Sequence, residues 1–160
     1  MKINIFWFRR DLRLEDNHGL SEALKGDLPV LPIFIFDDDI LEELPLDDAR
    51  VQFIYQSLSA IQESLVEFGS NLKVLKGKPI EVWKEILGEF DVNAVYTNKD
   101  YEPYSRTRDF EIQNLLKEQG ASFHRLKDHV IFEEREVMKP DGKPYTVFTP
   151  FKKRWLASFK

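Results

Sequence analysis

Three arginines follow the first apolar run of the chain. The run 5–8 (IFWF) is typical of a buried strand, and the charged residues after it are Arg9, Arg10, Asp11, Arg13, Glu15 and Asp16. Guanidinium groups recognise carboxylates and phosphates through paired hydrogen bonds, so such a cluster can bind an anionic or polar ligand. The alternative is a charged surface loop in which Arg13 pairs with Asp11 or Asp16. This stretch alone leaves both interpretations open.

Acidic and aromatic residues stand at the ends of two other apolar runs, 30–36 (VLPIFIF) and 94–98 (AVYTN). These residues are Phe34, Phe36, Asp37, Asp100 and Glu102. Together with the arginines they would provide charged groups beside large apolar walls, which is the usual composition of a ligand site. Whether they meet depends on the elements that carry them.

Five apolar runs predict strands, at 2–8, 30–36, 72–75, 94–98 and 122–126. Helical patterns lie between them, at about 18–25, 48–68, from Pro79 onward and at 103–120, with a short helix at 40–44 that Asp37, Asp38 and Asp39 can cap. The strand runs are almost continuously apolar, as expected of parallel strands buried on both faces. The sequence therefore predicts an α/β fold: a Rossmann-like, doubly wound, five-stranded parallel sheet of order 3-2-1-4-5 with helices on both faces.

This strand order brings the charged loops together. In an open parallel sheet, ligands bind outside the carboxyl ends of the strands where the strand order reverses, here between the first and fourth strands. The arginine loop, the loop at Asp100 and the loop at Asp37 all leave carboxyl ends near this point. Their convergence favours a binding site there.

Residues 131–160 differ in composition from residues 1–130, which we expect to form the α/β domain. From Gly142 onward the chain has no acidic residue, and its basic residues are Lys143, Lys152, Lys153, Arg154 and Lys160. Phe151, Trp155 and Phe159 are spaced four apart, which predicts one aromatic face of a helix. We expect this extended segment to be the start of a linker toward a further domain of a longer protein.

Composition excludes several classes of function. The chain has no cysteine, so it has no disulfides or thiolate metal sites, and a cytoplasmic location is expected. No apolar stretch is long enough to cross a bilayer. A net charge of -5 argues against DNA binding by this domain alone. The three histidines show no metal-ligand spacing, and no metal is expected. No GxGxxG, Walker A or GxSxG motif is present, so the chain looks incomplete as a catalyst.

Four sequence blocks resemble the photolyase/cryptochrome family, and most closely the bacterial cyclobutane pyrimidine dimer photolyases. The blocks are FWFRRDLRLEDN, the helix that begins DARV, VYTNKDYEPYSRTRD and YTVFTPFKKRW. The resemblance implies that the chain is the N-terminal domain, which holds a light-harvesting antenna chromophore. It also implies a following helical domain, absent here, that binds the catalytic FAD and damaged DNA. This chain alone would then neither hold FAD nor repair DNA.

The resemblance also implies which residues hold the antenna. The residues carried over are Arg10, Phe34, Asp37, Leu46, Asp100 and Glu102. Members that use a folate have an acidic residue where this sequence has Ser105, so a deazaflavin or FMN is favoured over folate. Phe34 and Leu46 would pack against a flat ring. Asp100 would accept a hydrogen bond from the ring NH, and Arg10 would bind ring oxygens or a phosphate.

Two alternative functions remain open on the sequence. One is a fragment of a cryptochrome photoreceptor with the same fold, and the other is a stand-alone nucleotide-binding module. Arg106, Arg108 and Asp109 also match a family pattern, and we expect them to form a structural network with the Arg13 loop or with the next domain.

Overall fold

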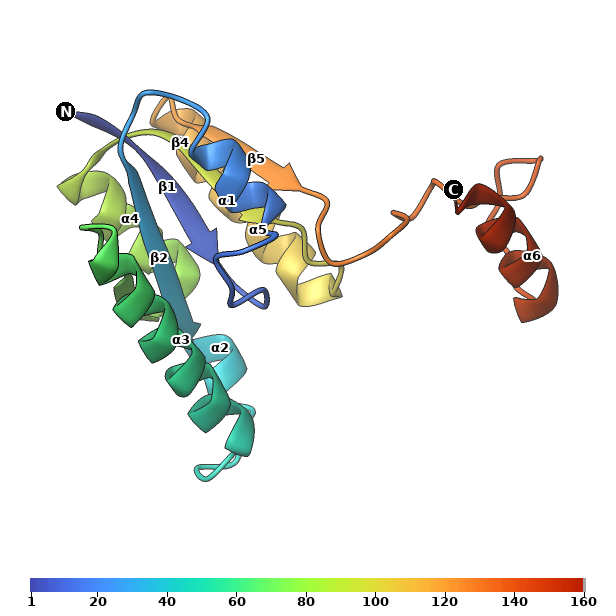
Figure 1. The fold of residues 1–160 in the computed structure, drawn as a ribbon, viewed down its shortest axis with the longest axis horizontal. Coiled ribbons are helices and arrows are strands. Elements are labelled where there is room, and N and C mark those ends of the chain that lie inside the picture. The colour runs from blue at the N-terminus through green and yellow to red at the C-terminus, as the bar shows by residue number, and fades with distance from the viewer. Residues whose placement is uncertain (160) are drawn as a thin grey trace. The chain divides into compact units, whose positions relative to one another are not determined.

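The five apolar runs form the strands of one parallel sheet (Figure 1). In the computed structural model, which describes residues 1–159, the strands are β1 (Lys2–Phe8), β2 (Val30–Asp37), β3 (Lys73–Gly77), β4 (Asp91–Asn98) and β5 (Ser122–Leu126). Their order is β3-β2-β1-β4-β5, so the predicted fold class and strand order are confirmed. β4 begins three residues before the predicted run, because Asp91 and Val92 already pair with Lys2 and Ile3 of β1.

Helices connect the strands, and most begin at a residue that suits a helix start. They are α1 (His18–Ala23), α2 (Asp38–Leu41), α3 (Ala49–Glu67), α4 (Pro79–Glu89) and α5 (Pro103–Glu118). α1 is capped by Asn17 and α3 by Asp48, whereas α4 and α5 open with proline. α2 starts two residues earlier than predicted, because the Asp37 side chain accepts from the backbone N–H of Asp39 and so caps the helix itself.

The sheet separates two apolar cores, and β1 contributes to both. Ile3, Ile5 and Trp7 face the core under α4 and α5, whereas Phe6 and Phe8 face the core under α1 and α3. This alternation is the two-residue period of a strand that is buried on both faces. Trp7 packs edge to face on Trp83 of α4, with ring centroids 5.5 Å apart, and both indoles are almost fully buried.

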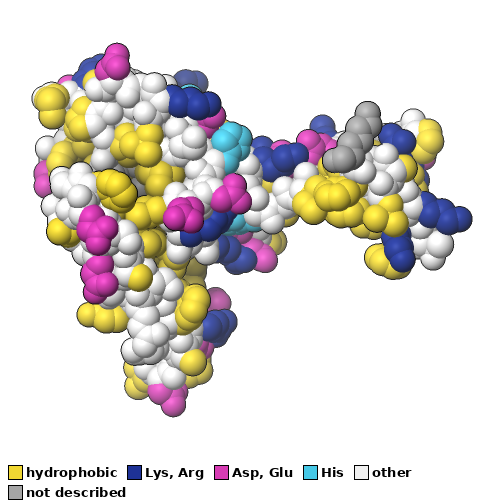
Figure 2. Space-filling view, in the orientation of Figure 1, with side chains coloured by type: hydrophobic (Ala, Val, Ile, Leu, Met, Phe, Trp, Pro, Cys, Tyr) yellow, Lys and Arg dark blue, Asp and Glu magenta, His cyan; other side chains and the backbone are white. Residues whose placement is uncertain are grey.

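The second core is partly open to solvent. Figure 2 shows apolar side chains open to solvent in the region of α1 and α3. A hollow of about 620 Å³ lies beside α1, with Leu14, Leu20 and Leu24 in its lining. It lies away from the loops at Arg10 and Asp100, whose residues do not line it.

The chain divides into two compact units, Met1–His129 and Val130–Lys160. The first contains the whole sheet and α1 to α5. The second contains α6 (Phe148–Ser158), whose Trp155 packs on two aromatic residues outside the helix: it meets Phe132 at 5.4 Å between ring centroids and stacks on Phe159 at 5.3 Å. Lys160, the last basic residue of the predicted tail, lies outside the described residues. Among residues 1–159, no helix combines the length and the apolar character that a membrane span requires.

Candidate ligand site at the carboxyl end of the sheet

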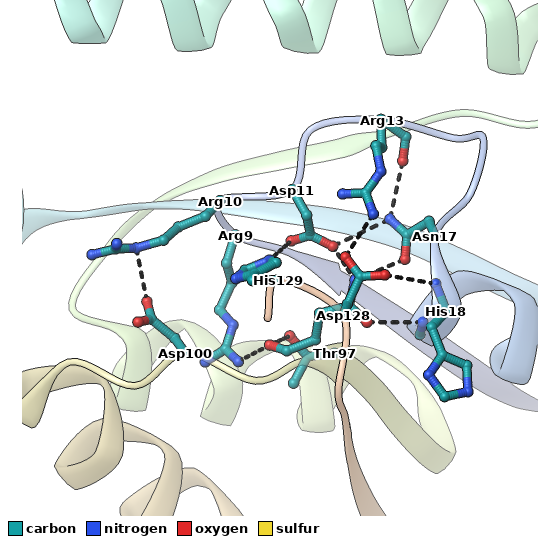
Figure 3. A network of polar contacts seen from close by, with 12 residues as sticks. Arg9, Arg10, Asp11, Arg13, Asn17, His18, Thr97, Asp100, Asp128 and His129 are labelled. Atoms are coloured by element: carbon teal, nitrogen blue, oxygen red, sulfur yellow. Dashed lines mark hydrogen bonds and ion pairs between the residues drawn. The ribbon is translucent and has the colours of Figure 1, made fainter. Parts of the chain in front are cut away.

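Arg10 and Asp100 meet where the strand order reverses. Arg10 follows β1 and Asp100 follows β4, the two neighbouring strands from which the connections diverge. Arg10 Nε lies 3.0 Å from Asp100 Oδ2, and Arg10 Nη2 lies 3.9 Å from Glu102 Oε1 (Figure 3). The Arg10 side chain is 60 % exposed and that of Asp100 only 7 % exposed, so an exposed guanidinium covers a buried carboxylate.

The Asp100 carboxylate is held by its own loop. Its Oδ1 accepts from the backbone N–H of Glu102 at 3.2 Å, and its Oδ2 accepts from the Ser105 hydroxyl at 2.9 Å. Burial favours the neutral acid, but these hydrogen bonds and the nearby Arg10 and Arg9 outweigh it and lower the pKa of Asp100. Asp100 is therefore an ionised, oriented acceptor at neutral pH.

Asp37 belongs to a neighbouring cluster that links β2 to α5. The Tyr104 hydroxyl donates to Asp37 Oδ2 at 2.7 Å, and Arg108 Nη1 lies 3.5 Å from the same oxygen. Burial and the Asp37 carboxylate raise the pKa of Tyr104. The Arg108 guanidinium lies 5.0 Å from the ring centre of Trp7 and 5.6 Å from that of Tyr104. Asp37 thus has structural partners in addition to its role as the α2 cap.

The two predicted apolar walls have different environments. Phe34 is buried in the core under α1 and α3 and packs edge to face on Phe36, with ring centroids 5.0 Å apart. Leu46 lies in the loop between α2 and α3 and is fully exposed. The structure therefore brings Arg10, Asp100 and Glu102 together, whereas Phe34, Asp37 and Leu46 lie outside that set of contacts.

The other two arginines of the opening loop pair with carboxylates of the protein itself. Arg9 is buried: its Nη1 lies 2.5 Å from Asp109 Oδ1, and its Nη2 donates to the backbone carbonyl of Asn98. Arg13 pairs with Asp128 at 2.7 Å rather than with the side chain of Asp11 or Asp16, and its other contact is the Asp16 carbonyl at 2.7 Å.

Asp109 forms the expected structural contact with the opening loop, because it pairs with Arg9 of the loop that also carries Arg13. Arg108 adjoins Asp37 instead. Both lie on the buried side of α5 with Ile112. Their helical spacing to Ile112, three and four residues away, was a signal in the sequence for buried charged residues.

Asn98, the last residue of β4, is a buried residue beside the site that sequence reasoning missed. Its side-chain NH₂ group donates to Asp11 Oδ2 and to Asn17 Oδ1, and its side-chain oxygen Oδ1 accepts from the backbone N–H of Gly19 at 2.8 Å. One buried side chain therefore fixes the loop after β1 and the start of α1 against β4. This contact spans 87 positions to Asp11 and leaves no periodic signal.

Comparisons with known proteins identify relatives of this chain. The family model described as DNA photolyase matches residues 4–160. A deoxyribodipyrimidine photo-lyase from Synechococcus sp. is 35 % identical over 156 residues, covering 98 % of this chain and 32 % of the relative. A bacterial class III photolyase structure from Agrobacterium tumefaciens superimposes with a TM-score of 0.84 at 29 % identity, covering 98 % of this chain and 31 % of that one.

A third similar protein is an archaeal photolyase from Sulfolobus tokodaii. Its structure was solved with two FAD molecules and implied a novel light-harvesting cofactor. It matches with a TM-score of 0.70 and 34 % identity, covering 84 % of this chain and 32 % of that chain.

A five-stranded doubly wound domain is thus shared with these enzymes. The chain belongs to the DNA photolyase family. It has the fold of their N-terminal α/β domain and spans about a third of the length of these photolyases.

Proposed function

We propose that this domain binds an antenna chromophore in the crevice between the loops after β1 and β4. The observation that carries the proposal is the pair formed by Asp100 and Arg10: a buried, ionised acceptor covered by an exposed guanidinium at the switch point of the sheet. Asp100 accepts from a ring NH, and Arg10 swings outward to meet ring oxygens or a phosphate.

A flavin-like ring, either FMN or a deazaflavin, fits these residues better than a folate does. Ser105 is a neutral residue whose hydroxyl is already bound to Asp100, so it offers no acidic group to a pterin. Phe34 gives an apolar floor, and Leu46 gives an exposed apolar side chain that can close over the ring. The light-harvesting cofactor implied by the Sulfolobus tokodaii photolyase supports the same chemical class.

In the whole protein, this domain supplies absorbed light energy to a catalytic FAD in a C-terminal helical domain. That domain binds ultraviolet-damaged DNA and carries out the light-driven repair of pyrimidine dimers. The support is the family to which the chain belongs and the greater length of its photolyase relatives. A cytoplasmic location suits such an enzyme.

Replacing the acceptor tests the proposal. Asp100→Ala is expected to weaken FMN or deazaflavin binding at least about 10-fold, because a hydrogen bond to a charged group contributes on the order of 1.5–3 kcal/mol. Binding is measured by the change in flavin fluorescence on titration with protein. Circular dichroism of the variant verifies that the fold persists.

The matched control is Asp27→Ala, which removes a carboxylate from an exposed loop position and leaves Arg10 and Asp100 in place. It is expected to bind the ring as the unmodified chain does. Stoichiometric binding that survives in a folded Asp100→Ala variant would rule out this site.

A further inference from the structure

Three side chains with metal-binding donor atoms converge beside the opening loop, outside the proposed chromophore site. They are Asp11, from the loop after β1, and Asp128 and His129, from the segment after β5 (Figure 3). One donor atom from each lies within 4.8 Å of the others. Their side chains are 1 %, 5 % and 21 % exposed, so this is not a solvated acidic surface.

The two carboxylate oxygens of Asp11 differ in the hydrogen bonds that they accept. Its Oδ2 accepts from the side-chain amides of Asn98 and Asn17, the latter at 3.2 Å. Its Oδ1 is buried and accepts no hydrogen bond of normal geometry from the described residues, and its ion-pair contact is with His129, at 3.5 Å. A buried carboxylate oxygen in this state is costly and leaves a position at which a cation can bind.

The distance between Asp11 Oδ1 and the His129 ring nitrogen Nε2 suits two ligands of one metal ion. His129 Nε2 lies 3.5 Å from Asp11 Oδ1, which exceeds the usual length of about 2.7–3.2 Å for an N–H···O hydrogen bond. Two donors about 2.0–2.1 Å from a tetrahedral zinc ion are roughly 3.4 Å apart. The pair is therefore spaced for a shared ion.

Asp128 is the third ligand, and its neighbours hold it in position. Arg13 Nη2 donates to its Oδ2 at 2.7 Å, and the backbone N–H of His18 donates to its Oδ1 at 3.1 Å. Each carboxylate oxygen has a second lone pair, so these contacts act as outer-shell support and leave room for a metal bond. With neutral His129, the two carboxylates and Arg13 sum to one negative charge, which attracts a cation.

We propose that Asp11, Asp128 and His129 bind a divalent transition metal ion. One imidazole nitrogen and two carboxylate oxygens match the donor preference of Zn²⁺, with the fourth position taken by water. The ion would tie the segment after β5 to the loop after β1, and so stabilise the folded state of the first unit by binding it preferentially.

The test uses the full chain without added affinity histidines. Calorimetric titration with Zn²⁺ is expected to give one ion per chain with a dissociation constant in the micromolar range. Co²⁺ is expected to give visible absorption bands at the same stoichiometry. His129→Ala is expected to weaken both at least about 10-fold, and to abolish the rise in the thermal unfolding midpoint that Zn²⁺ causes.

One histidine control and one acidic variant make the test specific. His124→Ala removes a histidine that stacks on Tyr96 and is expected to keep metal binding. Asp11→Asn is expected to lose it, with the fold verified by circular dichroism. Failure of the unmodified chain to bind Zn²⁺ below about 1 mM overturns the proposal. Equal binding by His129→Ala does the same.

Discussion

Arg9, Arg10 and Arg13 leave the same strand and reach three different environments. Arg9 is buried and pairs with Asp109, Arg13 pairs with Asp128, and Arg10, the most exposed of the three, pairs with Asp100. Two of the guanidinium groups therefore hold the loop in place, and we propose the third as a ligand contact.

At the scale of single residues, the buried ion pair between Arg9 and Asp109 is expected to contribute more to the free energy of unfolding than any surface ion pair does. Asp109→Asn leaves Arg9 buried without its counter-charge, and breaking a buried pair in this way costs about 3–5 kcal/mol. The measurement is the free energy of unfolding from urea denaturation. The matched control is Glu81→Gln, which breaks an exposed pair with Lys84 and is expected to cost no more than about 0.5 kcal/mol. Equal losses in the two variants would contradict the assignment.

A second prediction at this scale concerns Asp100 and the stability of the fold at acidic pH. Its pKa is lower in the folded than in the unfolded chain, so it contributes stability above the unfolded value of 3.8, and that contribution is lost as the pH falls through the folded value. Asp100→Asn is therefore expected to be less stable than the parent at pH 6, with a smaller difference at pH 3. Urea unfolding at pH 3, 4, 5 and 6 measures this. A difference that stays constant across the series would contradict the lowered pKa.

At the scale of elements, the close approach of α1 to β4 depends on a glycine. A Cβ at Gly19 would lie 2.6 Å from Asn98 Oδ1 and 2.9 Å from the Phe6 ring, and neither neighbour has room to move. Gly19→Ala is expected to destabilise the fold by about 1–3 kcal/mol through overpacking. Thermal and urea unfolding measure the loss.

Gly88 is the matched control within a helix. It lies in α4, and a Cβ there would meet nothing within 4 Å. Gly88→Ala is expected to stabilise the fold by up to about 1 kcal/mol, because alanine has the better helix propensity. A stabilising Gly19→Ala, or two variants of the same sign, would show that α1 does not pack as closely as described.

The elements also mark where sequence reasoning succeeded and where it could not. The strands and long helices were predictable because near-continuous apolar runs and three-to-four spacing are local signals, and the caps Asn17 and Asp48 lie beside them. The partners of Arg9 and Arg13 were not predictable, since they lie 100 and 115 positions away. Several carboxylates could satisfy each arginine on sequence alone, and only the packing of loops selects one.

At the scale of the molecule, the first unit is expected to fold by itself. The sheet, both cores and the proposed sites all lie within Met1–His129. A chain ending at His129 is expected to unfold cooperatively, with a midpoint within a few degrees of that of the full chain. Calorimetry measures both midpoints. Loss of a cooperative transition in the shorter chain would contradict this division.

We expect the carboxyl end of this sheet to bind a flavin-like ring, and an absorption difference titration tests this directly. The purified chain is titrated with FMN, with a deazaflavin and with a reduced folate. We expect a saturable shift of the flavin or deazaflavin band at one ring per chain, and weaker or no binding of the folate. An unchanged spectrum with both ring systems, or preferential binding of the folate, would contradict it.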